Sequence, residues 1–420
     1  MRCAVLLLSG LVFFAVRAWA HEPPPEESNV PQQLEPVVVS GERPVAASSQ
    51  QLIPDKDFEV RPQGRPADLV RLAPGLFISQ HAGGGKAEQY LLRGFDADHG
   101  TDVGLFWDDM PVNLRSHAHG QGYADTHFVI PETIKLLDVR KGPYHVEYGD
   151  FATAGTVNFV TRETVDENLI QAAGGRFDTG RFLTMLSPAR TGVRTLIAVE
   201  SYFTDGPFLN AQNFHRFNGL AKLTVNPTPR SELALAVTHY SGSWNASGQI
   251  PLREVLAGRL DRFGSIDPSE GGTTKRTVGN LKYHWDMTSQ STFLASAYLQ
   301  HYKLNLFSNF TFFVNDPLNG DGIEQDDDRY VYGGELAYQY GGRAYGMDGT
   351  AKVGMQTRID DGRVQMGTQR QRLRTGTTTD VDLLNRRIRR FSSSISSRCN
   401  GSGSSAGSGG IFSTTTSATG

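Results

Sequence analysis

Apolar and polar residues alternate with a period of two over long stretches of the chain after about residue 166. Leu281, Tyr283 and Trp285 fall on one side of such a stretch, and Lys282 and His284 fall on the other. This period predicts β-strands, because successive side chains of a strand point to opposite faces. The pattern fits a strand with a lipid face and a wet face, and it also fits a strand of a soluble sandwich.

The connections between the predicted strands separate these two possibilities. We expect nine strands, near residues 168–176, 180–187, 193–203, 215–226, 231–241, 277–286, 291–302, 331–341 and 348–360. Tight turns at 187–192, 226–230, 286–291 and 341–346 alternate with long connections at 204–214, 242–276 and 303–330. The acidic stretch 317–328 is predicted to be a solvated external loop. Alternation of short turns and long loops is typical of transmembrane barrels, so the sequence favours a partial barrel over residues 166–368.

Residues 60–165 show a mixed pattern instead. Residues 67–72 have helical spacing and stop before Pro74 and Gly75. Short apolar runs bounded by Gly, Asp and Pro predict strands at 75–78, 88–93, 103–107 and 134–139. We therefore expect a compact α/β domain over residues 60–165.

The N-terminus has the pattern of a secretory signal. An apolar segment of about a dozen residues follows Arg2, which is too short to span a bilayer, and Ala18-Trp19-Ala20 supplies a cleavage site. We therefore expect residues 1–20 to be a cleaved signal peptide.

Residues 21–59 predict a flexible leader, because they are rich in Pro, Glu, Gln and Ser. Residues 37–39 are three valines that follow Pro36, and this favours an extended backbone. Such a segment can add as a strand to the sheet edge of another protein. An ordinary short strand is the other interpretation.

Two motifs between residues 60 and 165 point to a known family. They are Leu91-Leu92-Arg93-Gly94-Phe95 and the run from Lys141-Gly142-Pro143 through Tyr148-Gly149 to Thr161. The domain that contains them resembles the plug domain of TonB-dependent outer-membrane receptors. The resemblance implies a mainly β protein, in which a mixed α/β plug precedes an antiparallel transmembrane β-barrel.

The resemblance also implies a function, namely energy-coupled uptake of a scarce nutrient across the outer membrane of a Gram-negative cell. The expected cargo is a metal or metal chelate, and neither enzymatic activity nor a cofactor is expected. The implied partners are the TonB protein, outer-membrane lipid and the substrate; with a net charge of −3, nucleic acid is not expected. The extended leader segment resembles a TonB box formed by Glu35, Pro36, Val37, Val38, Val39 and Ser40.

Histidines gather in the plug and suggest where a substrate binds. The candidate substrate-binding residues are His81, His99, Arg115, His117, His119 and Tyr123. His117 and His119 lie two apart in a glycine-rich loop and could offer imidazoles to a metal, or could hydrogen-bond within a polar plug. By resemblance, ion pairs lock the plug to the barrel wall through Arg93, Arg140, Lys141 and Glu147.

The predicted strands are too few to form a closed barrel. Plugged transporters have about 22 strands. About nine strands leave an open edge, whose backbone N–H and C=O groups cannot form hydrogen bonds in lipid. We expect residues 369–420, where alternation stops, to be low in complexity and disordered. Our hypothesis is that this tail is a shifted-frame translation, and a genuine disordered tail is the alternative. The alternative function is a non-transporting fragment whose plug binds TonB.

Overall fold

The computed structural model of the 420-residue chain describes residues 49–61, 65–80, 84–95, 100–344, 347–398 and 411–418. The expected signal peptide, Glu35 to Ser40 of the expected TonB box, His81 and His99 lie outside the described residues. Within the described part, residues 49–161, here called the plug, form a mixed domain, and an antiparallel sheet follows from Leu169. None of the helices described is long and apolar enough to cross a membrane.

The plug contains a five-stranded sheet with strand order β1-β6-β7-β4-β5 and a separate β2–β3 hairpin. Its strands are β1 (Ser49–Pro54), β2 (Leu76–Ser79), β3 (Gln89–Leu92), β4 (Val103–Trp107), β5 (Met110–Pro111), β6 (Ile134–Lys141) and β7 (Gly155–Thr161). Its helices are α1 (Lys56–Glu59) and the 3-10 helices η1 (Pro66–Leu72) and η3 (Pro131–Thr133). Strands β4 and β7 pair in parallel, whereas the other pairs are antiparallel.

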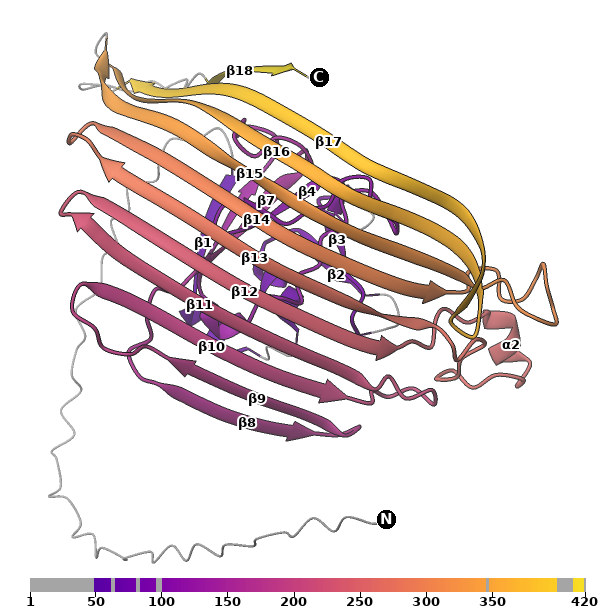
Figure 1. The fold of residues 1–420 in the computed structure, drawn as a ribbon. Helices are drawn as coiled ribbons and strands as arrows, with labels where there is room; N and C mark the ends of the chain where they lie inside the picture. Colours follow the sequence, from indigo (N-terminus) through magenta and orange to yellow (C-terminus); the bar gives the residue numbers. More distant parts are fainter. Residues whose placement is uncertain are drawn as a thin grey trace, which may run out of the picture. The chain divides into compact units, whose positions relative to one another are not determined.

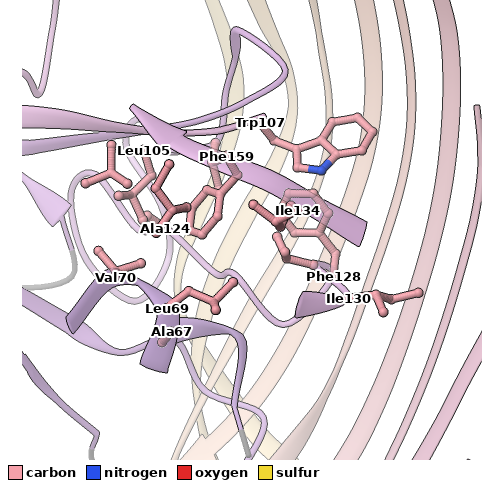
Figure 2. Packing of buried hydrophobic residues seen from close by; sticks show 14 of the residues in the cluster. Ala67, Leu69, Val70, Leu105, Trp107, Ala124, Phe128, Ile130, Ile134 and Phe159 are labelled. Carbon is pink, nitrogen blue, oxygen red and sulfur yellow. The ribbon is translucent and has the colours of Figure 1, made fainter. Parts of the chain in front are cut away.

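Local sequence explains these elements. Pro66 occupies the first turn of η1, where a missing N–H costs nothing, and the helix ends just before Pro74. All five residues of β4 are buried, as expected for a central strand with protein on both faces. Figure 2 shows side chains from η1, β4, β6 and β7 packing together in the apolar core of the plug.

The large sheet contains eleven strands in chain order from β8 to β18, as Figure 1 shows. They are β8 (Leu169–Gly175), β9 (Thr179–Leu186), β10 (Val193–Thr204), β11 (Phe214–Thr228), β12 (Ser231–Asn245), β13 (Gly271–Asp286), β14 (Ser291–Ser308), β15 (Ile323–Ala344), β16 (Met347–Arg370), β17 (Leu373–Arg398) and β18 (Ile411–Ala418). A short helix, α2 (Leu252–Leu256), lies in the long connection between β12 and β13. Every pair is antiparallel, and β8 and β18 stand at the two edges.

The strands of this sheet bury their polar face. In β11, Arg216, Asn218 and Lys222 are buried, whereas Phe217 and Leu223 are 44% and 45% exposed. A water-soluble sheet would bury the apolar residues, so this inversion indicates an outer face that meets lipid. The chain is thus mainly β, with a plug followed by an incomplete antiparallel barrel, as the sequence predicts. We call the inner face of the sheet the wall.

The structure differs from the expected boundaries in three places. Residues 49–59 contain β1 and α1 and belong to the plug sheet, although we expected a leader there. Residues 323–328 pair on both sides as the start of β15, although we expected a loop. Their acidic residues hid this strand, because the part of a strand beyond the lipid needs no apolar face.

The third difference lies in residues 369–420, which we expected to be disordered. They contain β17 and β18, so the sheet has eleven strands instead of about nine. Strand β17 pairs with β16 along its length, but Arg386 and Arg390 share a face with Leu384 and Ile388. This face has no apolar pattern, and only the backbone pairing reveals the strand. The shifted-frame hypothesis stays a prediction.

Candidate functional site between the plug and the wall

The turn between β4 and β5 attaches the plug to the wall through two carboxylates. Asp108 and Asp109 both have positive φ, at 45° and 66°, and so form a tight turn. Lys222 Nζ of β11 lies 3.1 Å from Asp108 Oδ2, and Lys282 of β13 donates to Asp109. Burial alone would raise the pKa of Asp109, but the Lys282 ammonium lowers it below its ordinary value.

Asp108 also binds the plug's own backbone. The N–H and hydroxyl of Thr161 donate to its two carboxylate oxygens at 2.9 and 2.5 Å. Asn280 Nδ2 of the wall donates to the Asp108 carbonyl at 3.0 Å. The turn is therefore held from both sides by polar contacts that would have to break if the plug moved.

A second contact joins η3 to the wall. Arg181 of β9 donates to both carboxylate oxygens of Glu132 at 2.6 and 2.7 Å, and its Nε donates to Glu200 at 2.6 Å. Glu200 is fully buried and also accepts from Arg216 at 2.9 Å. Charge-assisted pairs of this bidentate kind are the strongest hydrogen bonds available to side chains.

Strand β15 holds the plug loop that contains His117 and His119. Gln325 Nε2 donates to the Ala118 carbonyl at 2.7 Å, and the Ala118 N–H donates to Asp327 Oδ2 at 3.1 Å. Arg329 donates to the carbonyls of Arg115 and Ser116, and its Nε donates to Asp327 at 2.6 Å. The wall thus fixes the backbone of residues 115–118.

The two histidines of this loop face the wall. The ring of His117 stacks on Tyr123 at 4.1 Å, and its Nε2 lies 3.7 Å from Asp327 Oδ2. His119 Nδ1 lies 3.0 Å from Gln325 Oε1. The Tyr123 hydroxyl accepts from the Ala87 N–H at 2.9 Å, and burial raises the pKa of Tyr123. In the described ranges no three His, Cys, Asp or Glu side chains are grouped closely enough to hold a metal ion.

A second buried histidine lies deeper in the plug. His127 Nδ1 is 2.7 Å from Asp125 Oδ1, and its Nε2 is 3.9 Å from Glu88 Oε1. Burial alone would lower the pKa of His127, but the two carboxylates raise it above its ordinary value. Burial raises the pKa of Glu88. Asn218 of β11 donates to the His127 carbonyl at 2.9 Å, so this charged cluster also abuts the wall.

Comparison with known proteins decides what this plug and sheet are. Residues 43–156 match the TonB-dependent Receptor Plug Domain family. The chain therefore contains a plug domain of this family and resembles the TonB-dependent receptors. The Probable TonB-dependent siderophore receptor PirA of Acinetobacter baumannii is 28% identical over 153 residues, covering 34% of this chain and 20% of PirA. The Ferrienterobactin receptor of Escherichia coli is 25% identical over 167 residues, covering 37% of this chain and 22% of that receptor.

Solved structures match the fold of this chain over a larger part of its length than the curated relatives match its sequence. The ferric citrate transporter FecA in the unliganded form superposes with a TM-score of 0.66 at 16% identity, covering 89% of this chain and 59% of FecA. The copper transporter OprC superposes with a TM-score of 0.60 at 16% identity, covering 82% of this chain and 52% of OprC. The chain therefore spans little more than half the length of FecA and OprC. It matches about a fifth of the length of PirA and of the Ferrienterobactin receptor.

The four residues expected to lock the plug to the wall do not form the expected ion pairs with the wall among the described residues. Arg140 pairs within the plug, with Asp138 at 2.8 Å and Glu147 at 3.6 Å. Arg93 is exposed with a φ of 53°, and Lys141 is buried. The wall reaches Glu147 through its carbonyl, which accepts from Gln356 and Arg389.

The side chain of Glu147 is nevertheless strongly stabilised as a carboxylate. Burial alone would raise its pKa, but the hydrogen bond from His145 and further interactions lower the pKa of Glu147 to about 2. Sequence reasoning missed the ion pairs that do join plug and wall, among them those of Asp108, Asp109 and Glu132. Adjacent aspartates in a turn were the available signal, but their lysine partners are more than a hundred residues away in sequence.

Proposed function

We propose that this receptor takes part in the uptake of a metal chelate across the outer membrane, with energy supplied through TonB. The supporting observation is the plug itself, which is packed as a folded domain against the wall by ion pairs that are largely withdrawn from water. A plug held in this way must be displaced or rearranged before a solute can pass. An external source of work is therefore needed, because the ion pairs and hydrogen bonds between plug and wall have to be broken together.

The loop at residues 115–119 is the proposed substrate-facing element. Arg115 and His119 are partly exposed there, whereas His117 and Tyr123 are buried behind them. We infer that Arg115 and His119 contact the chelate and that His117 and Tyr123 position the loop. His81 and His99 are proposed as further contacts from the sequence alone. A chelate supplies most of its own metal ligands, so the protein need contribute only a few imidazoles.

The segment from Glu35 to Ser40 is the proposed site for TonB, after removal of residues 1–20 as a signal peptide. Its valines favour an extended backbone, and such a backbone can pair with a sheet edge of TonB. Ligand binding at residues 115–119 and pulling at Glu35–Ser40 would then act on the same folded plug.

Cells that produce this chain test the proposal through uptake of radioactive iron supplied as ferric citrate. We expect energy-dependent accumulation that is lost when residues 37–39 are deleted and kept when residues 26–28, also in the leader, are deleted. The His119→Ala variant should accumulate less iron, whereas His239→Ala, on the exposed face of β12, should match the wild type. Accumulation unaffected by the 37–39 deletion would argue against the TonB assignment.

We propose as a second function the alternative that the sequence left open, a non-transporting fragment whose plug binds TonB. The same cells separate the two proposals: the fragment would bind the periplasmic domain of TonB in a pull-down that depends on residues 37–39, yet show no accumulation of iron.

A further inference from the structure

A cavity of about 440 Å³ lies between the plug and the middle of strands β14 to β17. Its plug side is formed by residues 143–153, the loop that joins β6 and β7, together with Arg115. Its wall side includes Tyr298, Arg358 and Arg389. The volume lies in the range of small-molecule sites, which is about 300–1,000 Å³. Of the four residues expected to lock the plug, Glu147 is the one that lines this cavity.

The guanidinium of Arg115 lines the cavity, and two of its nitrogens donate no hydrogen bond to the described residues. Its Nη2 lies 2.7 Å from Asp150 Oδ2, but its Nε and Nη1 are buried and have no hydrogen-bond partner among the described residues. Buried N–H groups in native proteins almost always have an acceptor. Burial and the neighbouring Arg358 lower the pKa of Arg115 to about 10, so it is still charged at neutral pH. Arg115 therefore presents a positive charge that lacks acceptors.

Arg389 contributes a second charge that no carboxylate neutralises directly. It donates to two neutral oxygens, the Glu147 carbonyl at 2.7 Å and the Gln356 side chain. In the part of the chain that the structure covers, no carboxylate lies within ion-pair distance of Arg389. Its guanidinium fills the space beside Gly149, where a Cβ would lie 1.4 Å from Nη1. The glycine of the Tyr148-Gly149 motif thus makes room for this arginine.

The carboxylates of the lining already have cationic partners. Asp109 pairs with Lys282, Glu147 lies 3.6 Å from Arg140, and Glu335 lies 3.1 Å from Lys352. Asp150 is shared between Arg115 and Arg387, at 2.7 and 2.6 Å. Arg358 is occupied by Asp360 and by the Asn113 carbonyl. Apart from Glu147 Oε2, which accepts no hydrogen bond among the described residues, the unused hydrogen-bonding groups of the lining are the positively charged donors of Arg115.

We propose that this cavity binds a small anion that bears carboxylate or phosphate groups, with Arg115 and Arg389 as its main contacts. The planar guanidinium fork matches both groups, since each offers two oxygens to parallel N–H donors. Tyr148 and Tyr298 flank the same space and can donate further hydrogen bonds. This site shares Arg115 with the proposed substrate-facing loop, but its other contacts differ, and it needs neither TonB nor a metal.

Calorimetric titration of the full chain in detergent with inorganic phosphate, and separately with citrate, tests this proposal. Ionic strength is held constant with chloride. We expect one of the two anions to bind with one-to-one stoichiometry, which also identifies the preferred group. Arg115→Gln and Arg389→Gln should each weaken binding at least tenfold, or about 1.4 kcal/mol. Arg363→Gln, which removes an exposed arginine paired with Asp380, should bind like the wild type.

One further variant keeps the test decisive. If circular dichroism shows that Arg115→Gln does not fold, Arg115→Lys replaces it, because lysine keeps the charge but loses the fork, and a smaller loss of affinity is expected. No binding of either anion by the wild type would overturn the proposal. Equal affinities in the Arg115, Arg389 and Arg363 variants would overturn it as well. Because neither iron nor TonB is present, failure here leaves the proposed uptake function untouched.

Discussion

The interior of the plug and the inner face of the sheet are equally buried but opposite in chemistry. Leu105 and Phe159 in the plug core are fully buried, and so are Glu200, Arg276 and Arg329 on the wall. The plug buries apolar side chains against one another, as a soluble domain does. The sheet turns most of its apolar side chains outward and meets the plug mainly with polar groups, although Leu196 and Trp244 are among the wall residues that pack against apolar groups of the plug. The plug is thus held together by apolar packing, whereas its contact with the wall combines ion pairs and hydrogen bonds with smaller apolar contacts.

This arrangement has a mechanical consequence. Moving the plug as a unit would expose ion pairs and hydrogen bonds, which water can satisfy, and would leave the plug core intact. An apolar interface would instead expose hydrophobic surface at about 25 cal/mol per Å². A polar interface is therefore suited to a plug that is released and returns, and three substitutions test the comparison.

The largest effect is expected inside the plug. Phe159→Ala removes a fully buried ring from β7 and should lower the free energy of plug unfolding by about 3–5 kcal/mol. Hydrogen exchange of the β4 and β7 amides, in the full chain in detergent, should accelerate at least a hundredfold. Phe182→Ala, on β9 where the ring is 48% exposed, should leave these amides unchanged. Equal acceleration by both variants would contradict a separate apolar core.

A smaller effect is expected at the interface. Arg329→Met leaves Asp327 buried without its ion-pair partner and removes the hydrogen bonds to the Arg115 and Ser116 carbonyls. We expect a loss of about 3 kcal/mol, seen as faster exchange in residues 115–119 with β4 and β7 unaffected. Arg363→Met removes an exposed pair and should change exchange there by less than about 1 kcal/mol. Unchanged exchange of residues 115–119 in Arg329→Met would show that β15 does not hold this loop.

The smallest effect, with the opposite sign, is expected at Arg276. This fully buried guanidinium lies between the rings of Phe128 and Tyr302, at 4.9 and 5.1 Å. None of its three nitrogens has a hydrogen-bond partner among the described residues. Arg276→Met should be neutral or stabilising by about 1 kcal/mol, because it removes the desolvation cost of a charge while keeping contact with both rings. A fall of several degrees in the unfolding temperature would show that the charge itself holds the plug.

Local pattern predicted most of the elements. The period of two located strands β8 to β14 within a few residues, except that β13 and β14 continue about six residues further into the expected loops. The helical spacing at 67–72 corresponds to η1, and the apolar runs correspond to β2, β3, β4 and β6. Strand β17 was missed because arginine, serine and threonine leave no apolar face to detect. Its backbone pairs with that of β16, and this pairing, not the composition, shows that the segment is a strand.

The candidate site was less predictable. The cluster of plug histidines was visible in the sequence, but the structure turns His117 and His119 toward β15. No spacing rule could connect Asp108 with Lys222 or Glu132 with Arg181, since these partners come from separate domains. Arg140 and Glu147 pair with each other, so their side chains are not what joins the plug to the wall.

The sequence by itself determined that a compact α/β domain precedes strands with one apolar and one polar face, because periodicity and turn residues act over a few positions. Only the tertiary structure decided which polar residues meet across the interface, where the cavity lies and which arginines lack acceptors. Those features depend on side chains brought together from distant parts of the chain, and their energies depend on burial, which no local pattern specifies.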